Sequence, residues 1–342
     1  MGVTIRELAE ASGVAPSTVS YVINNGPRRI SARTRARVEE AMRRLNYTPN
    51  ALARGLVQKR IHTIGVVYTH YDHLIPSLYF LEVLQGILGA TMEHDQSVLL
   101  FTESLECDVT KNLMRWCDGR CDGLLVVALP HNTTVIEELR AREVPFVLIN
   151  YMSDRKDVTC LDVDNVSAAR NAVNYLIQMG HERIAIFCGQ DNLDSTHQRL
   201  AGYRQALEEA RLPVCDAWVF PGKYFEEFGY QQAEKLLAIP SHERPTAVFC
   251  TNDVLAIGAM KAFAEHGVRV PEDISLIGFD DIITASTIQP PLTTVRQPLA
   301  RIGARATELL LEQIEQKRAP GIKELLPTEL VIRATVAKPS CR

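Results

Sequence analysis

The first sixty residues constrain the fold most, because they have the pattern of short helices joined by a tight turn. Thr4 and Glu7 have the spacing of a capping box, which predicts a helix that starts at Ile5. Gly13 suits the left-handed residue that ends such a helix, and Pro16 fits the first turn of a second one. Two short helices in this arrangement can place the second one in the major groove of DNA.

A third helix pattern follows, from Ser31 to about Leu45, with Val38, Met42 and Leu45 at the spacing of an inward face. Its outer face carries arginines that suit phosphate contacts, namely Arg33, Arg35, Arg37, Arg43 and Arg44. The polar residues on the outer face of the second helix are Ser17, Thr18, Ser20, Tyr21 and Asn24.

The charge of the chain agrees with a nucleic-acid partner for this segment. Residues 1–60 hold eleven Lys or Arg and four Asp or Glu, whereas the rest of the chain holds 26 and 37. A basic segment on an acidic body favours a polyanion that contacts the segment alone. With 342 residues, the chain is long enough for two or three domains.

Several other classes of protein are not supported by the sequence. No apolar run reaches the roughly 18 residues of a membrane helix, and no signal-peptide stretch is present, so a cytoplasmic protein without a membrane partner is expected. The eight cysteines lack the spacing of a zinc site, and most of them are expected to be reduced, buried thiols. Because catalytic motifs are also missing, we expect neither an enzyme nor a bound metal or cofactor.

From residue 61 onward, short apolar runs alternate with helical patterns. Such runs are typical of parallel strands that are buried on both faces, which predicts a doubly wound α/β architecture in two lobes. The expected strands are Thr63–Thr69, Ser97–Thr102, Gly123–Leu129, Phe146–Ile149, Arg183–Gly189, Ala247–Thr251, Ser275–Gly278 and Leu325–Ile332. The clearest helix patterns are Leu78–His94, Val166–Met179 and Asp253–His266.

Polar residues follow several of these strands, at the ends where ligands bind in open α/β sheets. They are Asn150 and Tyr151, Gln190 to Arg199, Asn252 and Asp253, and Asp280 and Asp281. One of the two adjacent aspartates can instead cap a helix, and Arg199 can instead pair with a carboxylate of its own helix.

The chain resembles the lactose repressor/galactose repressor (LacI/GalR) family of bacterial transcription regulators. The segments that carry the resemblance are Thr4–Ala9, Val14–Asn24, Ser31–Arg35 and Leu45–Leu56, and the likeness continues to the end of the chain. It implies an all-α helix-turn-helix headpiece with a hinge helix, followed by an α/β core of two doubly wound lobes like a periplasmic binding protein.

The resemblance also implies domain boundaries. The helix-turn-helix DNA-binding domain is expected at 1–48, the hinge helix or linker at 49–60, and the effector-binding and dimerisation core at 61–342. We expect the N-lobe to comprise about 61–163 and 294–323, and the C-lobe about 164–292 and 324–342. The chain is then expected to cross between the lobes near 162–165, 291–296 and 322–327.

By the same resemblance, one set of residues contacts DNA. Pro16, Ser17 and Tyr21 match positions that face base edges, and Asn24 lies on the same outer face. The positions that match phosphate contacts are Thr4, Thr18, Ser31, Thr34, Tyr47 and Asn50. Either Arg28 or Arg29 is expected to reach DNA, and Leu56 of the hinge matches an apolar wedge between base steps in the minor groove.

A second set matches the effector site. Arg199, Asn252 and Asp280 match a polar trio that holds the ligand in sugar-responsive members, and Tyr224 matches an aromatic residue that stacks on the ligand ring. Other expected site residues are Tyr79, Phe80, Tyr151, Ser195, Asp253 and Gln297. Purine-sensing members have an arginine where this chain has Leu193, which favours a neutral sugar or a sugar derivative.

These features predict a DNA-binding transcriptional regulator, with a repressor favoured. Its affinity for a palindromic double-stranded operator is expected to respond to a small carbohydrate-like effector. A homodimer is expected because a palindromic site has two-fold symmetry. The alternatives are a regulator that senses a non-sugar metabolite or a protein partner, and a cytosolic sugar-binding protein without a direct regulatory role.

Overall fold

The computed structural model of the chain describes residues 3–23, 29–48, 60–68, 77–101, 109–131 and 133–340. These residues form two compact units, Met1–His62 and Thr63–Arg342, which we describe separately. The predicted hinge at 49–60 lies outside the described residues except for Arg60, and so do the predicted DNA contacts Asn24, Arg28, Asn50 and Leu56.

The first unit is built from three helices, α1 (Ile5–Ser12), α2 (Pro16–Ile23) and α3 (Ala32–Arg44). They bury a small shared core of Leu8, Ala9, Val19, Val22, Val38 and Ala41. The capping box is present, because the Thr4 hydroxyl accepts the Glu7 backbone N–H and the Glu7 carboxylate accepts the Thr4 N–H. The predicted helix-turn-helix is thus confirmed by its local chemistry.

Arg37 is exposed on the outer face of α3, as the sequence predicted, but its side chain contacts the neighbouring turn. The Arg37 guanidinium donates to the backbone carbonyl oxygens of Ser12 at 2.6 Å and Gly13 at 3.2 Å. These carbonyls lie at the end of α1, where backbone acceptors lack helical partners. Arg37 therefore stabilises the turn between α1 and α2, while Arg43 pairs with Glu40.

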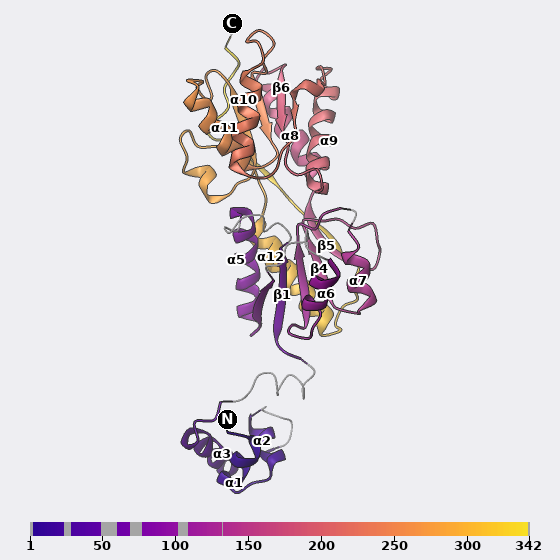
Figure 1. Cartoon of the computed structure of the whole chain (residues 1–342), viewed down its shortest axis with the longest axis vertical. Coiled ribbons are helices and arrows are strands. Elements are labelled where there is room, and N and C mark those ends of the chain that lie inside the picture. The colour runs from indigo at the N-terminus through magenta and orange to yellow at the C-terminus, as the bar shows by residue number, and fades with distance from the viewer. Residues whose placement is uncertain are drawn as a thin grey trace. The chain divides into compact units, whose positions relative to one another are not determined.

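The N-lobe of the second unit is a six-stranded parallel sheet in the order β11-β5-β4-β3-β1-β2. Its strands are β1 (Thr63–Tyr68), β2 (Ser97–Phe101), β3 (Gly123–Val127), β4 (Phe146–Ile149), β5 (Thr159–Val163) and β11 (Lys323–Leu326). One face packs against α5 (Leu78–Glu93) and α12 (Leu299–Ile314), and the other against α6 (Val109–Trp116) and α7 (Val135–Ala141) (Figure 1).

The C-lobe is a second six-stranded sheet, in the order β12-β10-β9-β8-β6-β7, with β12 antiparallel to β10. Its strands are β6 (Ile184–Phe187), β7 (Val219–Phe220), β8 (Ala247–Cys250), β9 (Ser275–Asp280), β10 (Thr293–Arg296) and β12 (Glu329–Val331). Its helices are α8 (Asn165–Gln178), α9 (Asp194–Glu209), α10 (Glu226–Leu237) and α11 (Asp253–Glu265), with short 3₁₀ turns at Asp216–Trp218 and Ile283–Ser286. The pair α8 and α9 covers one face, and α10 and α11 cover the other.

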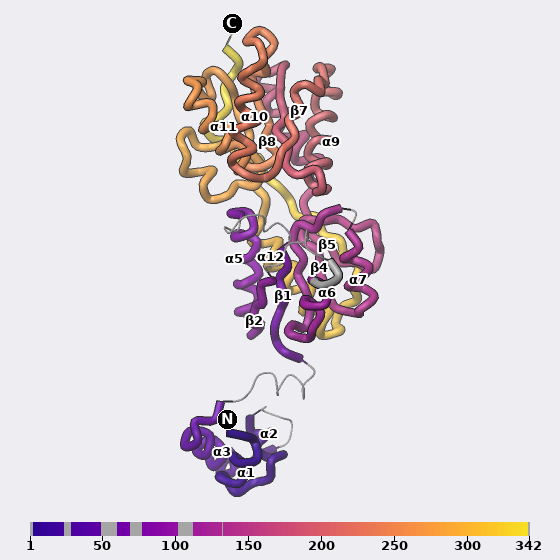
Figure 2. The backbone as a smooth tube through the Cα atoms, in the orientation of Figure 1, coloured from indigo at the N-terminus to yellow at the C-terminus, as the bar shows by residue number. Residues whose placement is uncertain are grey.

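The backbone trace in Figure 2 can be followed from lobe to lobe, and it corrects two predicted boundaries. Strand β10 pairs with β9, so residues 294–296 belong to the C-lobe rather than the N-lobe. Strand β11 pairs with β5 in the N-lobe, so the predicted strand Leu325–Ile332 is in fact two strands in different sheets. Pro298 and Pro327 lie within these crossings, just after β10 and β11 end, and a proline cannot donate to a continuing ladder.

Among the described residues, no helix is long and apolar enough to cross a bilayer. The described cysteines are free thiols, and Cys160, Cys188 and Cys250 are buried in the two lobes, as the sequence predicted. Burial raises the pKa of the Cys121 thiol to about 11, which leaves that partly buried side chain uncharged at neutral pH.

Close packing of α5 on α12 generates a first prediction. A Cβ at Gly86 would lie 1.8 Å from the Ala300 carbonyl oxygen, whereas nothing lies within 4 Å of a Cβ at Gly89 on the same helix. Gly86→Ala should lower the free energy of unfolding by about 1–3 kcal/mol through overpacking. Gly89→Ala should raise it by up to about 1 kcal/mol through helix propensity. Urea unfolding measures the free energy of unfolding of both variants. Equal changes in the two variants would contradict the close packing of Gly86 on Ala300.

Candidate functional site

The described residues that are predicted to face base edges lie on the outer side of α2. Pro16 and Ser17 are exposed at the start of α2, and Thr18 and Tyr21 are half-buried along it. Val19 and Val22 face the opposite way, into the core of the three helices. The exposure of Pro16 and Ser17 and the burial of Val19 and Val22 agree with the outward and inward faces of α2 that the sequence predicted, and base reading by this face stays a prediction.

Three of the predicted phosphate-contacting residues also complete helix starts. The Thr4 hydroxyl caps α1, and the Ser31 hydroxyl accepts the Thr34 N–H and lies 2.8 Å from the Thr34 hydroxyl at the start of α3. Tyr47 packs against the core of the unit, and Arg29 is exposed. Helix N-termini attract anions because their first N–H groups lack partners, so these caps suit a phosphate backbone.

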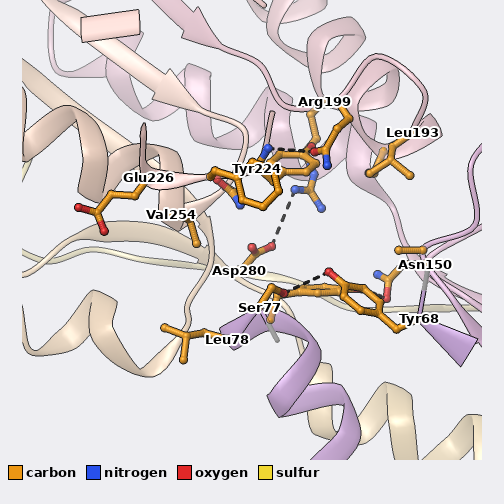
Figure 3. A pocket seen from close by; sticks show the side chains of 16 residues that line it. Tyr68, Ser77, Leu78, Asn150, Leu193, Arg199, Tyr224, Glu226, Val254 and Asp280 are labelled. Carbon is orange, nitrogen blue, oxygen red and sulfur yellow. Dashed lines mark hydrogen bonds and ion pairs between the residues drawn. The ribbon is translucent and has the colours of Figure 1, made fainter. Parts of the chain in front are cut away.

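The second unit contains a cavity of about 370 Å³ between the lobes. Six of the ten predicted effector residues line it, namely Tyr79, Ser195, Arg199, Tyr224, Asn252 and Asp280. Figure 3 shows Tyr68, Ser77 and Leu78 of the N-lobe facing Arg199, Tyr224 and Asp280 of the C-lobe. Three further lining residues, Asn150, Gln190 and Leu193, were noted in the sequence but not placed in the predicted effector set. The lining residues that the sequence analysis did not name are Tyr68, Ser77, Leu78, Ala128, Phe225, Glu226 and Val254.

Four predicted effector residues do not line the cavity. Phe80 is fully buried and stacks on Tyr68, with the ring centroids 4.3 Å apart, so it supports the wall from behind. Tyr151 packs in the cluster on the other sheet face, whereas its neighbour Asn150, which has a φ of 54° just after β4, lines the cavity. Gln297 is buried behind the lining, where its side-chain amide donates to the Asp280 carboxylate.

Asp253, the fourth of these residues, organises the backbone around the site. One carboxylate oxygen accepts the Thr294 hydroxyl at 2.5 Å, and the other accepts the Ile282 N–H at 2.9 Å. Its neighbour Asn252 caps α11 by accepting the Leu255 N–H and also lines the cavity. Burial holds the pKa of Asp253 well above its usual value, with a further contribution from nearby Asp280.

Arg199 is the best-anchored cation at the cavity floor. Its Nε donates to the Asn165 side chain at 2.9 Å, and one terminal nitrogen donates to the Thr251 carbonyl oxygen. Its guanidinium lies 3.7 Å from the centroid of the Phe279 ring and 3.8 Å from the Asp280 carboxylate. These contacts fix the guanidinium plane, so it presents donors in one orientation.

Asp280 is also fixed in place by its surroundings. It is 3 % exposed and accepts the Gln297 side-chain amide at 2.7 Å. Burial raises the pKa of its carboxyl group, and the charge of Arg199 opposes that rise. Its backbone has a φ of 122°, and the next residue, Asp281, has a φ of 61°. Two successive residues with positive φ are a costly arrangement that proteins keep mainly at functional sites.

A ring of hydrogen bonds, closed by the ion pair between Arg199 and Asp280, connects this floor to the crossings between lobes. Asn150 donates to both Asp162 at 3.3 Å and Gln297 at 3.4 Å. Asn165 donates to Asp162 at 3.3 Å and accepts from Arg199, which completes the ring through Asp280. Asp162 was missed because its strand was not predicted, although it too lies at the carboxyl end of a buried strand.

Comparison with known proteins agrees with both units. The model of bacterial regulatory proteins of the lacI family matches residues 4–50, and a periplasmic binding protein-like domain matches residues 173–336. The probable HTH-type transcriptional repressor ExuR of Bacillus subtilis is 35% identical over 98% of this chain and 99% of its own. The repressor PurR of Haemophilus influenzae is 34% identical over 97% of this chain and 98% of its own.

Solved structures show the same architecture. The lac repressor dimer bound to operator and the anti-inducer ONPF has a TM-score of 0.86 and 29% identity, covering 98% of this chain and 100% of that one. The complex of the transcriptional regulator CelR with cellobiose has a TM-score of 0.75 and 28% identity, covering 97% of this chain and 99% of that one.

Together, the helix-turn-helix unit and the two-lobed body with a central cavity define a DNA-binding transcriptional regulator rather than an enzyme. The chain belongs to the lacI family of bacterial regulatory proteins. The predicted fold class and the predicted general function are confirmed.

The buried carboxylate of Asp162 generates a second prediction. Burial raises its pKa to about 6, so it stabilises the fold when protonated and loses that contribution as the pH rises from about 4 through about 6. Its Oδ1 accepts N–H groups from Val163, Asn150 and Asn165, and an asparagine oxygen can replace it there. Asp162→Asn should therefore gain stability over wild type as the pH rises, by on the order of 3 kcal/mol above pH 6.

The matched control is Asp164→Asn, two residues away. The Ser167 N–H lowers the pKa of Asp164, so this variant should lose stability relative to wild type as the pH rises. Urea unfolding at a series of pH values measures both slopes. A parallel pH dependence in the two variants would show that burial does not control the Asp162 carboxyl.

Proposed function

We propose that this chain is a repressor whose affinity for a palindromic operator responds to a carbohydrate-like effector in the cavity. The observation that carries the proposal is the lining of the cavity, which combines Arg199, Asn252 and Asp280 with the aromatic side chains of Tyr224 and Tyr79. A guanidinium, an amide and a carboxylate together donate to and accept from adjacent hydroxyl groups. Aromatic side chains provide the apolar walls of such a site.

Other features agree with a neutral ligand. Leu193 lines the cavity, so this position offers an apolar surface rather than a charge. Arg199 is already engaged by Asn165, Thr251 and Phe279 and lies near Asp280. The structurally similar regulator CelR was solved with cellobiose, which supports a sugar for this cavity.

The DNA-binding roles are part of the same proposal. Residues 1–48 bind DNA, 49–60 form the hinge, and 61–342 bind the effector and dimerise. Ser17 and Tyr21 of α2 read base edges together with Pro16 and Asn24, and Leu56 wedges into the minor groove. Phosphate contacts come from Thr4, Thr18, Ser31, Thr34, Tyr47 and Asn50, with Arg28 or Arg29 beside them. The repressor works as a homodimer on cytoplasmic DNA, because a palindrome presents two equal half-sites.

The proposed switch is a change in how the two lobes are arranged. Ser77 and Tyr79 contact the effector from the N-lobe, and Tyr224 and Asn252 contact it from the C-lobe. A ligand held by both lobes favours the arrangement in which both sets of contacts form. The resulting shift in population changes the spacing of the two DNA-binding units in a dimer, and therefore the affinity for the operator.

A third prediction tests the DNA-binding role. Full-length protein is used to select duplexes from a random pool at low salt, where electrostatic binding is strong. The selected sequence should be palindromic, and Tyr21→Ala should weaken binding to it by about 1–3 kcal/mol while leaving binding to random DNA nearly unchanged. Arg33→Ala is the control, and it should weaken both kinds of binding similarly. Equal losses for both variants on both DNAs would contradict base reading by Tyr21.

A fourth prediction tests the effector site. Calorimetry with a panel of neutral monosaccharides and disaccharides, including cellobiose, should find a sugar that binds. Asp280→Asn should weaken binding of that sugar by at least about tenfold, because it replaces one acceptor oxygen with an amide group that can only donate. Asp281→Asn should retain affinity within about threefold, since Asp281 instead pairs with Arg296 and Arg333 outside the cavity lining. If no sugar in the panel binds, a non-sugar metabolite or protein partner becomes the better reading.

A further inference from the structure

Two histidines face each other from opposite lobes beside the cavity. His131 follows β3 of the N-lobe, and His197 lies in α9 of the C-lobe. Their ring centroids are 5.4 Å apart, and the rings are tilted by 42°. The segment of the C-lobe that approaches His131 also contributes Leu193 and Ser195 to the cavity wall. The pair is therefore placed to sense the distance between the lobes next to the bound effector.

Direct contacts cross from one lobe to the other at this point. The backbone N–H of His131 donates to the Asn192 carbonyl oxygen at 2.9 Å. The His131 ring nitrogen Nδ1 lies 3.5 Å from the carboxylate of Asp194, the first residue of α9. Both side chains are about two-thirds buried, with 28 % and 34 % of their side-chain surface exposed. A charge on the ring is thus only partly screened by solvent.

The other charged and titratable groups at this contact come from both lobes. In the C-lobe, His197 Nε2 lies 2.7 Å from the Asp191 carbonyl oxygen and 3.5 Å from its carboxylate. In the N-lobe, Tyr151 is close enough to Asp194 that burial and then the charge of this aspartate raise its phenol pKa, with a smaller contribution from Asp154. The two imidazoles are therefore placed among carboxylates.

We propose that His131 and Asp194 form a proton-operated latch between the lobes, with His197 as its neighbour across the contact. Histidine is the side chain whose charge changes between pH 5 and 8. When His131 is protonated, its ring and the Asp194 carboxylate form an ion pair that holds the N-lobe to the C-lobe. When it is neutral, that attraction is lost and the lobes separate more readily.

The sign of the effect follows from the distances. If both histidines are protonated, they repel each other, and their ring centroids are 5.4 Å apart. His131 attracts Asp194 at shorter range, because its Nδ1 lies 3.5 Å from a carboxylate oxygen. Coulomb energy falls with distance, so the attraction exceeds the repulsion. Asp191 further offsets the charge of His197 within the C-lobe. Acidification therefore favours the closed arrangement.

The consequence for regulation rests on the proposed effector function. If closure retains the effector, a fall in pH strengthens retention and so adjusts the response of the repressor to its ligand. The latch itself requires no ligand, which allows it to be tested separately from effector binding.

The test uses the hydrogen bond between the lobes as its reporter. Amide hydrogen exchange at residue 131 is measured by NMR in the ligand-free, full-length protein at about pH 6 and about pH 8, and each rate is corrected for the intrinsic rate. The protection factor should be about two- to fivefold higher at the lower pH, which is the size expected from one partly exposed ion pair. The protection factor of the Leu148 amide, inside the N-lobe sheet, should change by less than about twofold between the two pH values.

Variants separate the latch from a general effect of pH. His131→Gln and Asp194→Asn each keep the backbone donor and remove one charge, so each should abolish the pH dependence at residue 131. His242→Gln is the matched control, because His242 is exposed and pairs only with its neighbour Glu243 in the described contacts, so the pH dependence should persist. Equal protection at both pH values in the wild type would overturn the latch, as would a pH dependence that survives His131→Gln. Failure of every sugar to bind would instead count against the effector proposal alone.

Discussion

The interaction on which the site depends is the placement of Arg199 against Asp280 at the point where the lobes meet. A guanidinium and a carboxylate buried together must be compensated by further hydrogen bonds, or their desolvation would outweigh their attraction. Asn165, the Thr251 carbonyl and Gln297 provide that compensation. Two of these partners, Asn165 and Gln297, lie at crossings between lobes, so the polar floor and the connecting chain form one structure.

Two separate hydrophobic cores explain why the crossings can serve as a hinge. Each lobe buries apolar side chains on both faces of its own sheet, and the chain passes between them through short segments rather than through a shared core. Between the lobes the structure instead places the cavity, whose lining mixes apolar and aromatic side chains with a few polar ones joined by hydrogen bonds. Polar contacts exchange for water at lower cost than packed apolar surface, so a ligand or a proton can shift the balance between arrangements.

Much of this architecture could be predicted from local sequence. The capping box at Thr4 and Glu7, the apolar strand runs and the helix patterns indicate their elements directly, because local periodicity determines them. Membership of a sheet could not be predicted in the same way: β10 and β11 were assigned to the wrong lobes, since pairing depends on distant strands. For the site, residues after predicted strands were found, but Tyr151 was preferred to Asn150. Asp162 was missed because its strand, Thr159–Val163, was not predicted.

The most direct test of the account is the operator affinity of full-length protein with and without the sugar identified by calorimetry, measured for the wild type and Asp280→Asn at one low salt concentration. The account predicts a clear preference for a palindromic duplex in both proteins, and a change in that preference on adding sugar in the wild type only. A wild-type protein that binds random and palindromic DNA equally, with or without sugar, would contradict it.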